Sequence, residues 1–362
     1  MTIKWRSATV NRLGATWAGS VELYATLTHG PETGTEVKAL AHPDLVGTPA
    51  PGDRVLLNVS ALARGLGTGG YALVVALPDR LPQDPPPGPG HLVKARYTPL
   101  QTMVLGADDP ESGHHDTLAD ADDLHGTPVV VADLHSALPA VLAGVRADRP
   151  DARVAYVMTD GGALPAAFSR AVAGLREAGW LHTCITTGQA FGGDLETATV
   201  HTGLLTAALV TGADVVVVAQ GPGNLGTGSR WGFSGVAAGE ALNAAAVLHG
   251  RPVAALRVSE ADPRPRHRGV SHHTRTAVGR VALAPADVPV PTTPGAFYDD
   301  VRAQARGLCG RHRYVEVDDT GLDAALAASP VRLSTMGRGL DADRASFLVA
   351  AAAGRHAAAL LP

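Results

Sequence analysis

One segment of twelve residues, 262–273, concentrates side chains that can bind anions and move protons. It carries three arginines and three histidines behind an aspartate, within "ADPRPRHRGVSHHT". Guanidinium groups can hold a phosphate or carboxylate through paired hydrogen bonds, and imidazole titrates near neutral pH. In an extended segment the adjacent His272 and His273 point in opposite directions, so we expect only one of them to face a site. Both are predicted as catalytic acid/base candidates, with structural hydrogen bonding as the alternative. The predicted ligand-binding residues here are Arg266, His267 and Arg268.

A second segment, "VVVVAQGPGNLGTGSRWGFSG" at 215–235, places five glycines from Gly221 to Gly232, directly behind a valine run. A glycine loop between a strand and a helix exposes backbone N–H groups, which favour anions. The spacing contains G-x-G-x-x-G, but the acidic residue of a dinucleotide site is missing after a second strand. No G-K-[ST] follows, so neither a nicotinamide or flavin site nor a P-loop is expected. An anion cradle and a tight turn are the two interpretations. The residues predicted to bind ligand are Gly221, Gly223, Asn224, Gly226, Thr227, Gly228 and Arg230.

Two carboxylates are candidates to act beside a histidine. Glu240 is the only formally charged residue between Arg230 and Arg251, in a segment so apolar that its predicted helix would be buried. A buried carboxylate needs a partner, either in the site or in a structural ion pair. Asp194 precedes another alanine-rich segment, where an acid can cap a helix. Asp194 and Glu240 are predicted as catalytic partners, with capping and ion pairing as the structural alternatives.

The same residues match no common metal signature. A metal site would recruit Asp194, His201 or Asp262 beside the histidines, but the spacing fits neither H-x-x-x-H nor H-x-E. The two cysteines, Cys184 and Cys309, form no metal pattern either. We predict no metal site, and the sequence identifies no cofactor.

Alternating strands and helices from residue 127 onward would position these segments. The short, nearly all-apolar runs are "PVVVA", "VAYVM", "TCITT", "ADVVVVA" and "PVAALRV". The alanine-rich stretches between and after them lie at 134–148, 163–179, 195–211 and 231–249, and an amphipathic stretch follows at 341–359. Continuous apolar strands between helices are typical of a parallel sheet covered on both faces. The sequence therefore predicts an α/β domain, a mainly parallel sheet sandwiched by helices, over 127–362.

Glycine-rich or polar loops follow the predicted strands, whereas the segments that enter the strands are plainer. One such loop, "STMGRG", follows an expected late strand "VRL" and contains Arg338, which we add to the anion-binding residues. The C-terminal ends of parallel strands lie on one edge of a sheet, where ligands bind. We therefore predict one cleft at this edge, lined by Gly188–Asp194, Gly221–Ser229 and Arg266–His273.

The first eighty residues follow a different pattern. "SVELYATLT" alternates apolar and polar residues, and "TEVKALA", "DRVLLNV" and "GYALVVALP" follow with glycine and proline turns between them. Short strands without helices predict a small all-β, barrel-like domain over 1–80. The proline-rich "LPQDPPPGPGH" and the acidic loop behind it predict a linker over 81–126.

Composition indicates which classes of partner and which compartment to expect. The formal charge is −4 over 362 residues, with no dense Lys/Arg run, so no nucleic-acid partner is expected. No stretch of eighteen apolar residues and no signal-peptide pattern occurs, so no membrane partner and a cytoplasmic location with reduced thiols are expected. The alanine-rich stretches 195–211 and 231–249 look too apolar to face solvent, so either the sheet and a neighbouring layer or a second subunit must bury them. We favour a homodimer, because two-fold dimers are the commonest oligomers.

Four longer motifs resemble a known family. They occur in the order "TTGQAFGGDLET", "VVAQGPGNLGTGSRWGFSG", "ADPRPRHRGVSHHT" and "VRLSTMGRG", and together they resemble the uncharacterised bacterial domain-of-unknown-function family 3866 over nearly the whole chain. The resemblance implies no activity and assigns no functional residue, so the site prediction rests on the residues themselves.

The residues favour an enzyme, a hydrolase or group transferase, that acts on a small anionic metabolite carrying phosphate or carboxylate. The alternative is a non-catalytic anion- or nucleotide-binding or regulatory protein. A histidine within hydrogen-bond reach of a carboxylate in an open cleft would favour catalysis, and arginines beside a purely structural histidine would favour binding.

Overall fold

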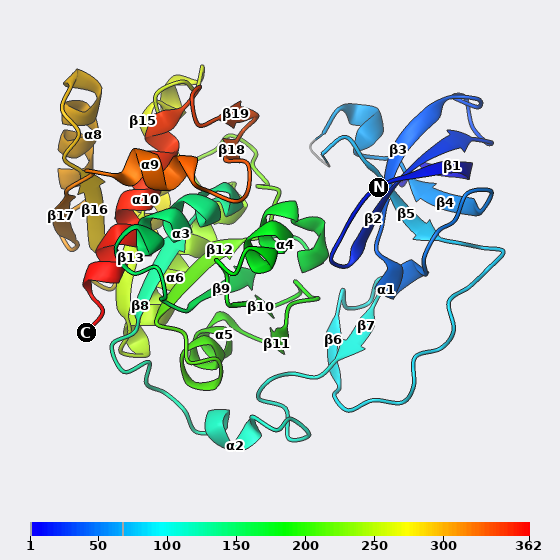
Figure 1. The fold of residues 1–362 in the computed structure, drawn as a ribbon, viewed down its shortest axis with the longest axis horizontal. Coiled ribbons are helices and arrows are strands. Elements are labelled where there is room, and N and C mark those ends of the chain that lie inside the picture. Colours follow the sequence, from blue (N-terminus) through cyan, green and yellow to red (C-terminus); the bar gives the residue numbers. More distant parts are fainter. Residues whose placement is uncertain (1, 67–68) are drawn as a thin grey trace. The chain divides into compact units, whose positions relative to one another are not determined.

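The computed structural model describes residues 2–66 and 69–362, which form two compact units (Figure 1). The units are Met1–Gly88 and Pro89–Pro362. The segment predicted as a linker, 81–126, is therefore divided between them. Its larger part folds with the second unit.

A buried lysine ties the start of the second unit to its sheet. The hairpin of β6 (Leu92–Lys94) and β7 (Thr102–Val104) ends its first strand at Lys94, whose side chain is completely buried. The Lys94 ammonium donates to the carbonyls of Ala190 and Thr197, each at 2.9 Å, and lies 3.2 Å from the Glu196 carboxylate. These contacts explain why the residues after Gly88 do not behave as a free linker.

The described part of the first unit is a closed five-stranded barrel, which confirms the predicted all-β domain. Its strands close in the order β1-β2-β3-β5-β4, with β3 and β5 parallel and the other neighbours antiparallel. This is the strand order of OB-type barrels. Alternate residues such as Leu23 and Ala25 are fully buried inside it. The elements are β1 (Trp5–Trp17), β2 (Ser20–Leu27), β3 (Glu36–Ala41), α1 (Pro43–Val46), β4 (Arg54–Asn58) and β5 (Ala72–Ala76).

The described part of the second unit is built on a parallel sheet of eight strands, which confirms the predicted α/β fold. The strand order is β11-β10-β9-β12-β8-β13-β16-β17, and every neighbouring pair is parallel. The valine-rich β12 lies inside the sheet, between β9 and β8. The strands are β8 (Pro128–Ala132), β9 (Val154–Thr159), β10 (Thr183–Thr187), β11 (Leu195–Thr197), β12 (Val215–Gln220), β13 (Arg251–Ala255), β16 (Asp287–Pro291) and β17 (Arg313–Val317).

Helices cover both faces of this sheet, as the continuous apolar strands require. On one face α3, α9 and α10 pack together, and on the other α5 packs against α6. Among the described residues no helix is long and apolar enough to cross a membrane. The helices are α2 (His115–Leu118), α3 (Leu138–Asp148), α4 (Arg170–Glu177), α5 (Val200–Leu205), α6 (Ala237–Val247), α7 (His272–Thr276), α8 (Ala296–Arg306), α9 (Leu322–Ala327) and α10 (Arg344–Ala359).

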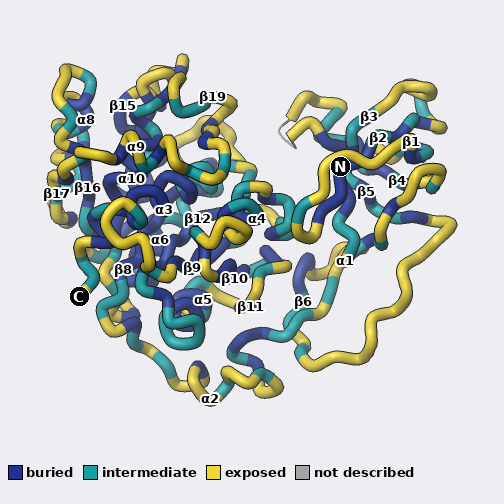
Figure 2. Tube along the Cα trace, viewed as in Figure 1, coloured by how far each residue is buried: buried dark blue, intermediate teal, exposed yellow. Residues whose placement is uncertain are grey.

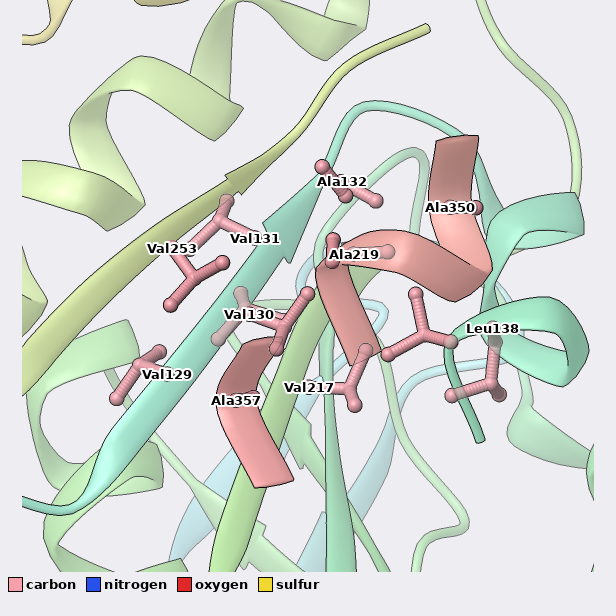
Figure 3. Close-up of a cluster of buried hydrophobic side chains, with 14 of the residues drawn as sticks. Val129, Val130, Val131, Ala132, Leu138, Val217, Ala219, Val253, Ala350 and Ala357 are labelled. Atoms are coloured by element: carbon pink, nitrogen blue, oxygen red, sulfur yellow. The ribbon is translucent and has the colours of Figure 1, made fainter. Parts of the chain in front are cut away.

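The core is built mainly from valine and alanine, and the strands β8, β9, β10 and β12 are buried almost throughout (Figures 2 and 3). Alanine-rich α10 approaches α3 closely, because each helix has a glycine at the crossing. A Cβ on Gly144 would lie 1.9 Å from the Ala351 carbonyl oxygen, and one on Gly354 would lie 2.0 Å from that of Val141. Close contacts between small side chains therefore fill a core that has few large aromatic side chains.

The direction in which successive strands are added across the sheet reverses once. From β8 the chain crosses to β9 on one side, and from the adjacent β12 it crosses to β13 on the other side. Right-handed crossovers then place α3 and α6 on opposite faces of the sheet. Such a switch point leaves a crevice at the C-terminal strand ends, which is where α/β proteins bind ligands.

Two predicted elements differ from the structure. The stretch predicted as a helix from 195 begins as strand β11, so α5 starts only at Val200, where the Thr199 side chain accepts from the Thr202 N–H. The expected strand "VRL" does not join the sheet, and the short hairpin of β18 (Ser334–Thr335) and β19 (Arg338–Gly339) follows it. Asp194 therefore does not cap α5.

Candidate functional site

The switch point brings together polar residues that directly follow three central strands. Asp133 follows β8, Gln220 ends β12, and Arg257 lies two residues beyond β13. The Gln220 side-chain amide donates to the Asp133 carbonyl at 2.6 Å, while its own Oε1 is buried without a partner. None of these three residues is among the site residues predicted from the sequence. An acid placed directly after the "PVVVA" run was the signal that could have identified Asp133.

The histidine segment folds back onto the end of β13. The two-residue strands β14 (Val258–Ser259) and β15 (Gly269–Val270) pair antiparallel, and Ser271 donates its N–H to the Arg257 carbonyl. Ser271 also caps α7, since its hydroxyl accepts from the His273 N–H. This return places the start of α7 beside the C-terminal end of β8.

Three histidines meet at this point. The ring centroids of His267, His272 and His273 are 4.4–5.0 Å apart. One ring nitrogen of each lies within 4.8 Å of those of the other two. His267 Nδ1 bonds the Ser271 hydroxyl at 2.8 Å, whereas His272 Nε2 is buried without a hydrogen-bond partner among the described residues. Both His272 and His273 thus face the cluster, because α7 begins at His272 and replaces the extended backbone that the sequence suggested.

A carboxylate and an arginine adjoin His273. Its Nδ1 lies 3.5 Å from Asp133 Oδ2 and 2.9 Å from Arg257 Nη1, and the Arg257 guanidinium lies 3.6 Å from the same carboxylate oxygen. Asp133 Oδ2 is buried and has no hydrogen bond of normal geometry. Phe233, at the end of the glycine segment, stacks on the His273 ring with centroids 3.8 Å apart. The arrangement is a histidine held between an aromatic ring and a charged pair.

The environment keeps two of the histidines uncharged at neutral pH. Burial, reinforced by Arg257 and Arg264, lowers the pKa of His267 to about 3. Burial, together with His273 and the nearby arginines, lowers the pKa of His272 to about 4. Neutral imidazole offers a lone pair, so both rings can accept a proton or bind a Lewis acid.

Arg338 lines the small pocket beside Asp133 and Arg257, but its guanidinium is already paired with two carboxylates. Its guanidinium donates to Asp343 at 2.9 Å and lies 3.3 Å from Asp262. Asp262 is also held by Arg264, whose hydrogen bonds keep the pKa of that carboxyl well below its usual range. Asp343 accepts further hydrogen bonds from the Ser259 hydroxyl and the Glu260 N–H. The carboxylates already satisfy Arg338, so it serves this network, which we call the acid–arginine network.

The glycine segment forms a loop that bonds to itself. Thr227 N–H donates to the Gly232 carbonyl, and the Ser234 hydroxyl accepts from the Leu225 N–H and donates to Asn224. The glycines have local reasons to be there: Gly223 and Gly228 have positive φ, and a Cβ on Gly221 would meet Leu164 and Met158. These contacts support the tight-turn interpretation for most of the loop.

The loop nevertheless reaches the histidine segment. The Arg266 guanidinium lies 3.8 Å from where a Gly228 side chain would begin. Arg230, Arg266 and Arg268 are all exposed, and Arg266 is close enough to His272 to lower its pKa. Two of the three predicted segments therefore lie together, and they bring exposed positive charge to the histidine cluster.

The third predicted segment and the two predicted carboxylates lie elsewhere. Gly188–Asp194 follows β10, which β9, β12 and β8 separate from β13. Asp194 accepts from the Cys184 N–H and from Arg176, so it braces the edge strand. Glu240 is exposed on α6, because the buried face of that helix is formed by its glycine, alanine and leucine residues. The expectation that Glu240 is buried is wrong.

The space around Asp133 is small. One pocket of about 30 Å³ lies toward β13 and α10, beside Arg257 and Asp262, and a second of about 10 Å³ lies toward β12 and α6, beside Gln220 and Ser234. Volumes of this size hold water molecules or an ion. A larger ligand would have to bind from the exposed side, where Arg266 and His272 lie.

Comparison with known proteins supports the family resemblance. No curated protein and no solved structure matches the chain. The model of the family described as "Protein of unknown function (DUF3866)" matches residues 38–354, which include the histidine cluster, the glycine loop and the acid–arginine network. Because the match covers nearly the whole chain, the protein belongs to the DUF3866 family.

Proposed function

We propose that this protein is a hydrolase or group transferase that acts on a small anionic metabolite at the C-terminal edge of its sheet. The observation that carries the proposal is the contact of His273 Nδ1 with Asp133 Oδ2, at 3.5 Å, at the switch point of the sheet. A carboxylate that faces a histidine can fix its tautomer and stabilise it when it becomes charged.

The roles follow from position and charge. Exposed Arg266 and Arg268 would hold the phosphate or carboxylate of the ligand. His273 would activate the attacking water or hydroxyl, and Asp133 would orient this histidine. His267 and His272, whose pKa values are lowered by burial, would stay uncharged beside it. The positive charge of Arg257 would stabilise negative charge that develops beside His273.

Anion binding is the first test. Inorganic phosphate, pyrophosphate and small dicarboxylates should raise the melting temperature of the full chain. A ligand at one hundred times its Kd adds about 2.7 kcal/mol of stability. Arg266→Ala should weaken binding by roughly 1.5–3 kcal/mol, since it removes a charged hydrogen bond from an exposed side chain. Arg12→Ala, an exposed arginine of the barrel, is the matched control. No stabilisation by any anion at millimolar concentration would contradict the proposal.

Turnover is the second test. Activated phosphate and carboxylate esters should be hydrolysed by the wild type, and much more slowly by Asp133→Asn. Saturable anion binding without turnover of any such ester would instead favour a binding or regulatory protein. This outcome would remove the catalytic part of the proposal and keep its ligand.

We also propose that the chain forms a homodimer through α6. Most apolar residues of this helix are buried within the chain, but Val247 is 64% exposed and Leu283 is 70% exposed. The two are neighbours, because the Leu283 N–H donates to Asn243, one turn before Val247. A monomer mass by light scattering at micromolar concentration would contradict the dimer, and Val247→Glu should dissociate it.

The proposed setting is the cytoplasm. Cys184 and Cys309 are both free thiols, and burial raises the pKa of each. Unpaired thiols are typical of reducing compartments. Location of the tagged chain by cell fractionation would test this.

A further inference from the structure

We propose that His267, His272 and His273 hold a divalent transition-metal ion, with zinc as the best fit, and that Asp133 orients His273 from outside the ligand set. The inference concerns residues of the proposed site but does not need the proposed reaction. It rests on how the three rings face one another and on which of their nitrogens are already bonded.

The spacing of the ring nitrogens suits one ion. One nitrogen of each histidine lies within 4.8 Å of the other two. Zinc binds imidazole nitrogen at about 2.0–2.1 Å, so tetrahedral ligand nitrogens lie about 3.3 Å apart. The rings therefore need to approach by no more than roughly 1.5 Å, which side-chain rotation at the start of a short helix can supply.

The remaining nitrogens are arranged as in known metal sites. A metal-bound histidine normally donates its other ring N–H to a carboxylate, carbonyl or hydroxyl. His267 Nδ1 contacts the Ser271 hydroxyl at 2.8 Å, and His273 Nδ1 contacts Asp133 Oδ2 at 3.5 Å. Each leaves its Nε2 for an ion, and His272 Nε2 is buried with no hydrogen-bond partner in the part of the chain that the structure describes.

One contact must change when the ion binds. Arg257 Nη1 lies 2.9 Å from His273 Nδ1, and arginine only donates, so this Nδ1 accepts and the neutral ring carries its proton on Nε2. Binding an ion at Nε2 transfers that proton to Nδ1, where it can point to Asp133 Oδ2, which has no hydrogen bond. Arg257 then turns to the same carboxylate, 3.6 Å away.

The ligand set selects the class of ion. Three imidazoles suit zinc and its transition-metal neighbours, whereas magnesium and calcium prefer oxygen ligands. Three protein ligands leave a fourth position for water, which is the pattern of catalytic rather than structural zinc. The histidines would then hold the ion, and the ion would activate water beside the exposed arginines that are expected to hold the anion.

Metal titration of the full chain tests the inference. After treatment with a chelator, the wild type should bind one equivalent of zinc, and cobalt should give the intense visible absorption of a four-coordinate ion. His272→Gln should weaken zinc binding by more than about 100-fold, and Asp133→Asn by about 10–100-fold, the range for orienting residues. His272 Nε2 has no bond to lose, so its variant should remain folded, which circular dichroism checks.

A second cluster supplies the control. His91, Asp109 and Glu111 are also close enough to share an ion, but His91 and Glu111 are exposed. His91→Gln should therefore bind zinc as the wild type does. The inference is overturned if the wild type binds no zinc stoichiometrically, or if His272→Gln and His267→Gln both bind like the wild type. Zinc binding without any response to phosphate would remove the proposed function and leave the ion site standing.

Discussion

Two polar clusters lie beside the end of β13 and differ in how completely their hydrogen bonds are made. In the acid–arginine network, Asp343 accepts from Arg338, Ser259 and the Glu260 N–H, and Asp262 accepts from Arg264. In the histidine cluster, Asp133 Oδ2 and His272 Nε2 are buried without a hydrogen-bond partner within residues 2–66 and 69–362. Buried polar atoms are rarely left unsatisfied unless they serve a ligand, an ion or a strained site.

The difference separates scaffold from site better than residue type does. Arginine, aspartate and serine look as functional in the sequence as histidine, yet their network is closed. A comparison of two histidines makes the same point. Burial lowers the pKa of both His135 and His272 to about 4, but His135 bonds Tyr156 and Ser169 through its two ring nitrogens. A shifted pKa alone therefore does not identify the site.

The largest effect should come from opening the closed network. Asp343→Ala removes a fully buried carboxylate and leaves Arg338 without its closest partner, which should cost about 3–5 kcal/mol of unfolding free energy. Asp341→Ala, an exposed acid two residues earlier, is the control and should cost less than about 0.5 kcal/mol. Urea denaturation of both variants measures this. Equal losses would mean that the network is not the stabilising element.

A smaller loss is expected at the closed histidine. His135→Ala should destabilise the fold by roughly 1–3 kcal/mol, because the Ser169 hydroxyl and one side of the Tyr156 hydroxyl lose their partner. Thermal unfolding monitored by circular dichroism gives the value. If His135→Ala lowered the unfolding free energy by less than His272→Ala, His272 and not His135 would be the more important scaffold residue.

Protonation of His135 should also make the stability of the fold depend on pH. Since its pKa is about 4 when folded and about 6.5 when unfolded, the unfolded chain takes up the proton first as pH falls. Stability is therefore lost as pH falls from about 6.5 toward 4, up to about 3 kcal/mol from this residue. His135→Asn should lack that part of the loss. Identical pH profiles for wild type and variant would show that the ring is not held neutral.

The smallest effect on stability is expected at the open cluster. His272→Leu should change the unfolding free energy by less than about 0.5 kcal/mol, or raise it slightly, because it replaces an unsatisfied polar atom with an apolar side chain of similar size. The same variant should lose ligand and metal binding. A large destabilisation would place His272 among the scaffold residues and weaken both proposals.

The sequence predicted the central strands and the β-barrel because their apolar patterns are strong. It missed β16, "DVPVP", and β17, "RYVEV", since prolines and charged residues interrupt both runs. It also wrongly predicted a helix from residue 195, where strand β11 lies. Glu196 of this strand is buried because it pairs with Lys94, about one hundred positions earlier in the chain. Long-range pairing of this kind leaves no local signal.

The site was predicted in part. The histidine and glycine segments meet, but the closeness of three histidines depends on a turn, a two-residue strand and a helix start, which no spacing rule describes. Asp133 and Arg257 contribute through the order of strands β8 and β13 in the sheet. That order cannot be read from either segment alone.

The position of α10 has a consequence for synthesis. This helix packs against α3 and against β8, β13 and β16, yet it begins only at Arg344. The strands and α3 are made first, so the part of the sheet that α10 covers stays open on a nascent chain until residues 344–359 emerge from the ribosome. The glycine crossing with α3 then fixes where that helix can dock. Chains that stall or are cut before residue 344 should expose this part of the sheet and become substrates for chaperones or proteases.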